Sequence, residues 1–434
     1  MRYCWPITMV ICLFPGVVSG LSLDEALSRA SEQAITLQVL AAETRQAQAI
    51  HQQSSQAFLP IISTDAVWLR ADSSLINAVP VPATGAPMGL QRIDLGPLEG
   101  TLIGVQIVQP LYNADALLQR KSAELNVNAR RHSEQWGQQA IRLEVARQYF
   151  DILRMQEHQE AAVLSLSAAV KAARLAAAGY QQGLASRLDM EQSEAEQAAG
   201  EARVAQTHAA IWQAQYRLKS LLGIAPSTSL ELEDSMPFPL SPKAIVDPAL
   251  RKDLEAGKLA VKAANTRTNA FEADWFPRLN LLARQQWVRG DEPLDGADSW
   301  LVAVTLQWTL FDGFGRQGRI AEARSEAQKA RAELEQTRRR IHREQAIAMS
   351  QWQASFSTWQ AATKSVEAAE RATELAIRRY EEGVGSMTDL LAARARRDRE
   401  RASLIDSRYQ AVLSGMNYQL QNGYDPLLAL GREQ

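Results

Sequence analysis

The chain is poor in cysteine: Cys4 and Cys12 are its two cysteines, among 434 residues. Both fall in an N-terminal segment where a basic residue precedes an apolar run over 7–18 and small or branched residues follow at 18–20. This is the pattern of a secretory signal peptide, predicted over 1–20; the alternative is a buried N-terminal helix. The expected mature chain has no disulfide, no thiolate nucleophile, no cysteine metal site and no N-terminal cysteine to carry a lipid.

Long apolar runs are also missing. After the predicted signal peptide, no segment offers the roughly 18 or more consecutive apolar residues of a membrane-spanning helix. A mature chain that crosses a membrane is therefore expected to do so as strands. The net charge of −2 argues against a nucleic-acid partner, because such proteins usually carry a strong basic surplus.

Signs of catalysis are equally sparse. The five histidines are scattered, and no pair has the spacing of a helical metal site. Gly313-x-Gly315-x-x-Gly318 fits a weak dinucleotide pattern after a strand, but the βαβ context is missing because the following helix is far too long. We therefore predict that the protein is not an enzyme and has no metal and no cofactor.

What the sequence does contain is a duplication. Five residues recur 200 positions later: Tyr180, Gly183, Ser186, Asp189 and Gly223 reappear as Tyr380, Gly383, Ser386, Asp389 and Gly423. A proline-rich segment separates the copies. We predict a first structural repeat at 21–223, an inter-repeat linker at 224–248, a second repeat at 249–423 and a C-terminal tail at 424–434.

Each copy predicts a helix, a strand, a loop, a strand, a very long helix, a tight turn and a returning helix. Ser22 and Glu25 form a capping box for the first helix, which is expected to run to about Gln56. The runs 113–178 and 315–379 are rich in Ala, Gln, Glu and Arg, with apolar residues spaced by three, four and seven. This spacing indicates helices packed in coiled-coil fashion, each about 100 Å long.

Alternation with period two marks the strands. It is sharpest over 278–289 and 299–310, where tryptophans lie near the strand ends. The matching strands 61–70 and 101–109 are less regular, and the proline-rich loop 71–100 between them is expected to be exposed. Apolar and polar faces over about 9–11 residues, with aromatic ends, are typical of membrane barrel strands. The alternative is a soluble sheet packed on one side.

Four strands are too few to close a membrane barrel. The smallest have about eight, and an open edge would leave backbone groups unpaired in lipid. The chain is therefore expected to oligomerise. Two protomers would give eight strands around a filled interior, and three would give twelve, which is wide enough for a lumen. The long helical hairpins would continue this cylinder, so the whole would be a conduit.

The residues also resemble a known family. The opening Leu21-Ser22-Leu23-Asp24-Glu25-Ala26-Leu27, the two Tyr-x-x-Gly-x-x-Ser-x-x-Asp motifs and the duplication are similar to the TolC-like outer membrane efflux proteins, over essentially the whole mature chain. The resemblance implies a mainly α fold with a membrane β-barrel. It would be a homotrimer with a 12-stranded barrel in the outer membrane lipid of a Gram-negative bacterium, a periplasmic α-helical barrel and an equatorial region.

The implied function is a passive exit duct of a tripartite efflux or type I secretion system. Its expected partners are a periplasmic adaptor (membrane fusion) protein and an inner-membrane pump that supplies the energy. The alternative from another class is a non-porous periplasmic coiled-coil scaffold or spacer.

The resemblance also suggests site residues. In the family the hairpin tips dock onto the adaptor, which here selects Gly183, Leu184, Ser186, Gly383, Val384 and Ser386. Small residues let a partner helix approach closely; alternatively, the two glycines merely terminate helices. The family's tips also close the idle tunnel, which makes Tyr180, Asp189, Tyr380 and Asp389 a candidate periplasmic gate. The aspartates could instead only stabilise helix N-termini. Gly385 and Ala392 depart from the family's basic and acidic residues there.

Two further features have plain structural interpretations. The arginines at 394, 396, 397, 399 and 401 alternate with acids such as Asp398 and Asp406, which predicts a solvated helix face. The alternative is contact with the adaptor or the lumen. Gly200 is an isolated mid-helix glycine outside the tips, where substitution is expected to leave docking unaffected.

Overall fold

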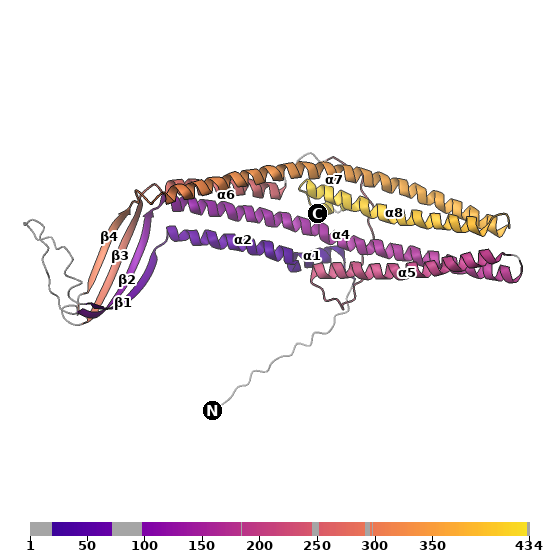
Figure 1. Ribbon diagram of the computed structural model, residues 1–434, viewed down its shortest axis with the longest axis horizontal. Coiled ribbons are helices and arrows are strands. Elements are labelled where there is room, and N and C mark those ends of the chain that lie inside the picture. The colour runs from indigo at the N-terminus through magenta and orange to yellow at the C-terminus, as the bar shows by residue number, and fades with distance from the viewer. Residues whose placement is uncertain are drawn as a thin grey trace, which may run out of the picture. The chain divides into compact units, whose positions relative to one another are not determined.

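The computed structural model describes residues 20–71, 98–183, 185–244, 251–290, 296 and 298–431. The predicted signal peptide up to residue 19, most of the loop 71–100 and Leu184 lie outside the described residues. The chain divides into two compact units, whose elements are labelled in Figure 1. We call them the hairpin unit (Met1–Ala41, Ser133–Asp253 and Arg338–Gln434) and the strand unit (Ala42–His132 and Leu254–Thr337). Each unit takes residues from both sequence copies.

The strand unit contains one four-stranded antiparallel sheet in the order β1-β2-β3-β4. Its strands are β1 Ile61–Ala71, β2 Leu98–Tyr112, β3 Arg278–Gly290 and β4 Ser299–Gln307. The four predicted strands are confirmed, but β4 ends three residues before the expected Leu310. Gln307 pairs with Arg278, the first residue of β3. The residue before Arg278 is a proline, which has no N–H to continue the ladder, so the pairing stops there.

The sheet has one polar and one apolar face. Asp65, Gly104 and Arg284 share the polar face, where Arg284 Nη2 lies 3.0 Å from Asp65 Oδ2. These two residues belong to strands that are not neighbours. They meet above Gly104, where a Cβ atom would lie 2.9 Å from Asp65 Oδ1. On β4, the apolar residues of the other face, Trp300, Val302, Val304 and Leu306, are 59–76% exposed. An unpaired apolar face of this kind suits contact with lipid.

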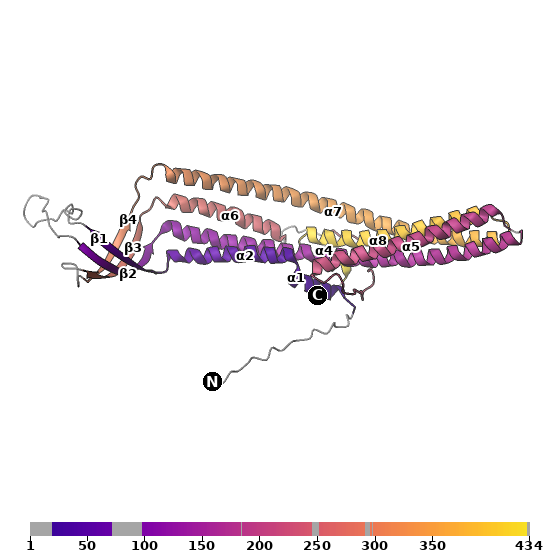
Figure 2. The ribbon, with the colours of Figure 1, turned by 60° about the horizontal axis from the view of Figure 1, so that its bottom comes forward.

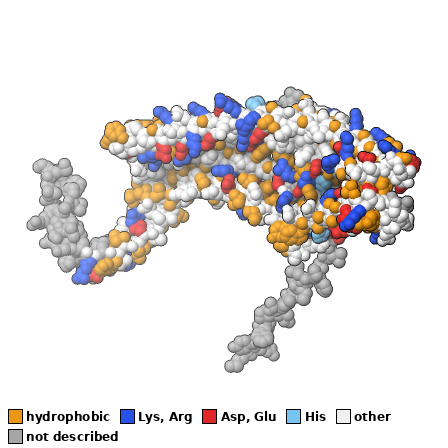
Figure 3. All heavy atoms as spheres, turned by 45° about the vertical axis from the view of Figure 1, so that its right-hand side comes forward, with side chains coloured by type: hydrophobic (Ala, Val, Ile, Leu, Met, Phe, Trp, Pro, Cys, Tyr) orange, Lys and Arg blue, Asp and Glu red, His pale blue; other side chains and the backbone are white. Residues whose placement is uncertain are grey.

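Four helices adjoin the sheet in the order α2, α4, α6 and α7, as the ribbon in Figure 2 shows. Their bounds are α2 Ile35–Gln53, α4 Ala114–Gln181, α6 Lys252–Ala273 and α7 Gly315–Glu381, and the short 3₁₀ helix η1 Ser54–Ala57 follows α2. In the strand unit, Ser122 Oγ donates to the Ala263 carbonyl at 2.8 Å, and Arg130 pairs with Glu43 at 2.8 Å. The two long helices are confirmed, with 68 and 67 residues. Positive and negative side chains are interspersed over the helices in Figure 3.

The first helix is not continuous. It consists of α1 Leu23–Gln33 and α2, separated at Ala34, whose φ of −62° and ψ of 116° are extended. The predicted N-cap is present, because Ser22 Oγ accepts a hydrogen bond from the Glu25 amide. Ala34 is 2% exposed, so the break is held by packing.

The hairpin unit contains α1, α5 Arg187–Leu222, α8 Met387–Gln421, the 3₁₀ helix η3 Pro426–Leu430 and the C-terminal parts of α4 and α7. Its core includes Tyr149, whose Oη lies 2.8 Å from the Leu21 carbonyl and 2.9 Å from Asp234 Oδ2. The Leu23 amide donates to the same carboxylate oxygen at 2.8 Å. These hydrogen bonds join the start of α1, the middle of α4 and the inter-repeat linker.

A buried arginine joins further segments of this unit. Arg251 is 1% exposed and pairs with Asp253 at 2.7 Å and Glu344 at 3.1 Å. It also donates to Gln421 Oε1 at 2.8 Å and lies 4.4 Å from the centre of the Trp136 ring. The start of α6 is thereby fixed to α4, α7 and α8, and the buried charge is neutralised.

By length and composition, one helix of the described residues, α4, contains an 18-residue window that could cross a membrane. Its mean hydropathy is 1.4, and 28% of it is buried. The helix has no uninterrupted apolar run of that length. This window alone therefore does not identify a membrane span.

Candidate functional site

The first hairpin tip turns between the end of α4 at Gln181 and the start of α5 at Arg187. Ser186 caps α5: its Oγ accepts from the Asp189 amide, and Asp189 Oδ2 accepts from the Ser186 amide, both at 3.1 Å. This reciprocal pair is a complete capping box. The Asp189 carboxylate thus stabilises a helix N-terminus, as one of the two sequence interpretations held.

The second tip repeats the turn between α7 and α8. Ser386 Oγ accepts from the Asp389 amide at 3.0 Å, while the Asp389 side chain is exposed. The two caps follow from the same Ser-x-x-Asp spacing. In this tip the amides of Val384 and Gly385 both donate to the Arg379 carbonyl at 2.9 Å, which satisfies the end of α7.

Both tip glycines terminate helices. Gly183 and Gly383 have φ of +73° and +72°, the left-handed conformation that a side chain disfavours. A Cβ atom built on either would meet no described atom within 4 Å. Each tip therefore presents open surface as well as a helix end. Val384 beside Gly383 is 65% exposed.

Two of the four candidate gate residues lie close together. Tyr380 packs against a small apolar cluster of Ala176, Met387 and Leu390, which are at most 3% exposed. Burial raises the pKa of Tyr380, and the negative charge of Asp189 from the other hairpin raises it further. Nearby, Thr388 Oγ1 lies 3.4 Å from Gln192 Oε1, also between hairpins. Tyr180 and Asp389 lie on exposed surface instead.

A polar network further along α4 and α8 also joins the hairpins, and sequence reasoning missed it. Arg154 Nη1 and His158 Nε2 lie 3.1 Å and 2.9 Å from Asp406 Oδ1. Burial raises the pKa of Asp406, but the hydrogen bond and charge of His158 and the charge of Arg154 outweigh it and hold this pKa below its ordinary value. The interleaved acids of the arginine-rich run were the signal that could have found this contact.

The arginine-rich face of α8 is only partly solvated, contrary to the sequence expectation. Arg396 and Arg399 are exposed, but Arg397 is 15% exposed and pairs with Asp398 at 2.7 Å. Arg394 donates to the Ala168 carbonyl of α4 at 3.3 Å. The interleaved acids allow these cations to be partly buried, because each retains a hydrogen-bond acceptor.

Gly200 is likewise not a neutral position. It is buried, and a Cβ atom built on it would lie 3.1 Å from Leu166 Cδ1 on α4. The absence of a side chain brings α5 close to α4. Substitution at Gly200 would therefore push the two helices of the first hairpin apart.

Comparison with known proteins identifies the family. The profile described as "Outer membrane efflux protein" matches residues 26–224 and 249–415, which is most of the chain. The chain belongs to the outer membrane efflux protein family. The resemblance seen in the sequence is therefore confirmed, as are the mainly α fold and the outer membrane location with helices in the periplasm.

Solved outer membrane proteins share the fold at low identity. The outer-membrane channel OprN is 21% identical with a TM-score of 0.77, over 92% of this chain and 89% of that one. VceC from Vibrio cholerae is 18% identical with a TM-score of 0.77, over 93% and 96%. The Campylobacter jejuni CmeC channel is 16% identical with a TM-score of 0.78, over 93% and 86%. No curated protein matches the sequence.

Proposed function

We propose that three copies of this chain form the passive exit duct of a tripartite exporter. The observation that carries the proposal is a four-stranded sheet with an apolar face, in which the edge strands β1 and β4 each pair with a strand on one side only among the described residues. Lipid does not tolerate such edges, so β1 of one copy pairs with β4 of the next. Three copies give twelve strands, enough to enclose a lumen.

We further propose that the two tips dock onto a periplasmic adaptor, with an inner-membrane pump supplying the energy. The docking residues are Gly183, Leu184, Ser186 and their counterparts Gly383, Val384 and Ser386. Support comes from the open surface around both glycines and, in the second tip, from the exposed Val384 between Gly383 and the α8 cap. A partner helix can approach a backbone closely where no side chain intervenes, and the exposed apolar residue then becomes buried.

The tips also serve as the periplasmic gate in this proposal. Tyr380 and Asp189 contribute a contact between the two hairpins of a protomer at the tips, and the exposed Tyr180 and Asp389 are available to neighbouring copies. The buried cluster around Tyr380 supports the first of these roles. Opening requires that this cluster separate, so its apolar contact sets the energy of the closed state.

A glycine comparison tests the docking assignment. Gly183→Trp and Gly383→Trp place a bulky group on the tips, and each also imposes about 1–2 kcal/mol of backbone strain because φ is positive. Gly313→Trp is the matched control: its φ is +65°, a built Cβ meets no described atom within 4 Å, and it lies in the strand unit. All three variants are expected to trimerise.

Only the tip variants are expected to lose export and crosslinking to the co-expressed adaptor, each by about tenfold or more, as for loss of a central contact. If the Gly313 variant lost both equally, backbone strain would account for the effect. If the tip variants exported and crosslinked normally, docking would be assigned wrongly. A stable, fully soluble monomer would contradict the duct itself.

A further inference from the structure

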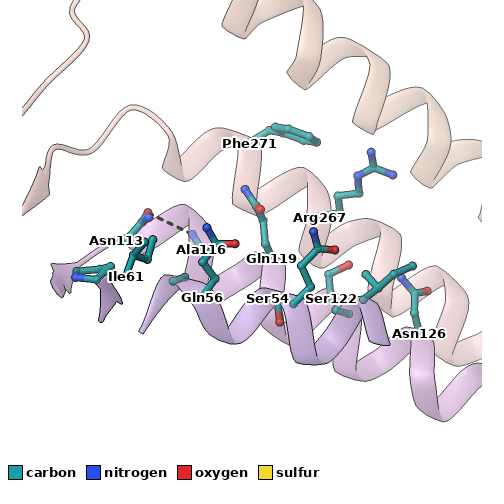
Figure 4. Close-up of a pocket in the computed structure, with 15 residues that line it drawn as sticks. Ser54, Gln56, Ile61, Asn113, Ala116, Gln119, Ser122, Asn126, Arg267 and Phe271 are labelled. Atoms are coloured by element: carbon teal, nitrogen blue, oxygen red, sulfur yellow. Dashed lines mark hydrogen bonds between the residues drawn. The ribbon is translucent and has the colours of Figure 1, made fainter. Parts of the chain in front are cut away.

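A cavity of about 730 Å³ opens in the strand unit where the helices meet the sheet (Figure 4). Its walls come from α2 with η1, from the first turns of α4 and from α6. These helices all belong to one protomer, so the cavity does not need a second copy to complete it. Its lining is rich in side-chain amides: Gln53, Gln56, Asn113, Gln119 and Asn126.

These amides make few hydrogen bonds within the protein, and the side chains of Gln53, Gln56 and Asn126 are exposed. Asn113 Oδ1 accepts from the Ala116 amide at 3.3 Å, and Gln119 Nε2 donates to Asp115 at 3.3 Å. Within the described part of the chain, the side chains of Gln53, Gln56 and Asn126 have no hydrogen-bond partner. Each free amide offers both a donor and an acceptor. The cavity can therefore bind a solute that carries hydroxyl or amide groups.

The charge of the cavity disfavours cations. Among the described residues that line it there is no carboxylate, and Arg267 supplies the one charged side chain. Arg267 Nη1 pairs with Glu326 at 3.0 Å, and its guanidinium lies 5.6 Å from the centre of the Phe271 ring. Arg267 is about half exposed, so its remaining donors can still reach an anion. Phe271 and Ile50 add apolar surface for a ring or an alkyl group.

The cavity opens on the polar side of the sheet. Ile61 and Pro110, at the ends of β1 and β2, both line it. Both lie in the same alternation as Asp65 and Gly104, on the polar face and away from lipid. In a closed barrel, polar strand faces line the lumen. A solute in the duct would therefore reach this cavity without crossing the membrane.

We propose that this cavity is a site in the duct wall that transiently binds neutral or anionic amphipathic solutes bearing hydroxyl or amide groups. The assignment rests on the proposed duct function and narrows its substrate class. Because the cavity is open to solvent, binding is weak, with a dissociation constant on the order of 1 mM. Weak binding suits a conduit, since a solute must leave as readily as it enters.

Three probes test the chemistry on the full chain in lipid nanodiscs, by saturation-transfer NMR and equilibrium dialysis against empty nanodiscs. They are 4-methylumbelliferyl β-D-glucoside, its glucuronide and ethidium. The glucoside and the glucuronide share the methylumbelliferyl ring and the ring hydroxyls of the sugar, and they differ at C6, where a carboxylate replaces the hydroxymethyl group. We expect both to bind, the glucuronide severalfold more tightly, and ethidium not to bind. Arg267→Gln should abolish the preference for the glucuronide.

Paired variants test the location. Gln53→Ala combined with Asn126→Ala removes two free amides and should weaken binding of both glycosides about tenfold, as expected for two hydrogen bonds. Gln52→Ala is the matched control, because Gln52 is the exposed neighbour of Gln53 and does not line the cavity. It should leave binding unchanged.

Equal loss in the control and the double variant, no loss in either, or ethidium binding as tight as that of the glucuronide would each overturn the assignment. The measurement uses no adaptor, pump or transport. A failed duct would show as loss of trimer or conductance with glycoside binding intact, whereas a failed cavity would leave trimer and conductance unchanged.

Discussion

Tyr149→Phe is the sharpest test of how the hairpin unit is held together. The substitution deletes one oxygen atom and keeps the buried ring. That oxygen lies 2.8 Å from the Leu21 carbonyl and 2.9 Å from Asp234 Oδ2, where the Leu23 amide also donates. Burial raises the pKa of Tyr149 well above 10, and its hydrogen bond to Asp234 raises it further, so the phenol stays protonated as a donor at neutral pH.

The magnitude follows from the charge of the acceptor. A hydrogen bond to an ionised group contributes about 1.5–3 kcal/mol, and its loss leaves a part-buried carboxylate with fewer donors. Leu21 also pairs with Leu232 in an isolated β-bridge. Loss of the Tyr149 hydrogen bonds therefore releases the start of α1 from the inter-repeat linker. Because each 1.4 kcal/mol changes an equilibrium constant about tenfold, local opening should become about 10- to 150-fold more frequent.

Hydrogen exchange measures this opening directly. The reporters are the amides of Leu21, Leu23 and Glu233, which donate to Glu231, Asp234 and Leu21. Their exchange should accelerate in the variant by the factor given above, while exchange near the tips stays unchanged. Tyr409→Phe is the control. Tyr409 is also buried, but its hydroxyl lies 3.5 Å from the Arg147 carbonyl, too long for a strong bond.

Unchanged exchange at all three reporters would refute the reasoning, as would equal acceleration in the Tyr409 variant. The raised pKa adds a pH signature. A raised pKa means that the folded state binds the Tyr149 proton more tightly than the unfolded state does. The stabilisation that Tyr149 contributes is therefore complete below pH 10 and declines only above it. The Phe variant should lack that decline.

Two further predictions concern the contacts between hairpins. Tyr380→Ala removes the ring from the cluster with Met387 and Leu390, so the conductance of purified protein in planar bilayers should rise severalfold. Tyr216→Ala, at an exposed tyrosine of α5 outside the tips, should leave the conductance unchanged. The pKa of Asp406 is lower in the folded state than in the unfolded chain. The stabilisation that Asp406 contributes is therefore present above pH 3.8 and is lost as the pH falls through its folded-state pKa. The resistance of α8 to proteolysis should therefore fall at acid pH. Asp406→Asn should lower this resistance at neutral pH and remove its further fall at acid pH.

Much of the fold follows from local patterns. The Ser-x-x-Asp spacing accounts for both hairpin caps, because the cap bond joins residues only three apart. The strands were equally predictable, because alternation places Trp300 and Val302 on one face of a strand whichever strands pair with it. The duplication and the family resemblance then placed these elements in one known architecture.

What sequence could not predict depends on distant partners. The break at Ala34 is set by its burial, and the Tyr149 contacts join residues 85 and 128 positions away. Arg397 could equally have faced solvent, because a helix face with both charges suits either environment until a second helix is placed beside it. The amide-lined cavity is similar: its glutamines look like ordinary surface until three helices bring them together.

The small gap above Gly104 has an evolutionary consequence. A side chain there would meet the Asp65 carboxylate at 2.9 Å and the Arg284 guanidinium at 3.1 Å, so the ion pair keeps its present geometry only above a glycine. Loss of either charged partner removes this constraint on position 104. Among relatives, these three positions should therefore change together: lineages that lose the ion pair become free to replace the glycine, and lineages that keep the pair do not.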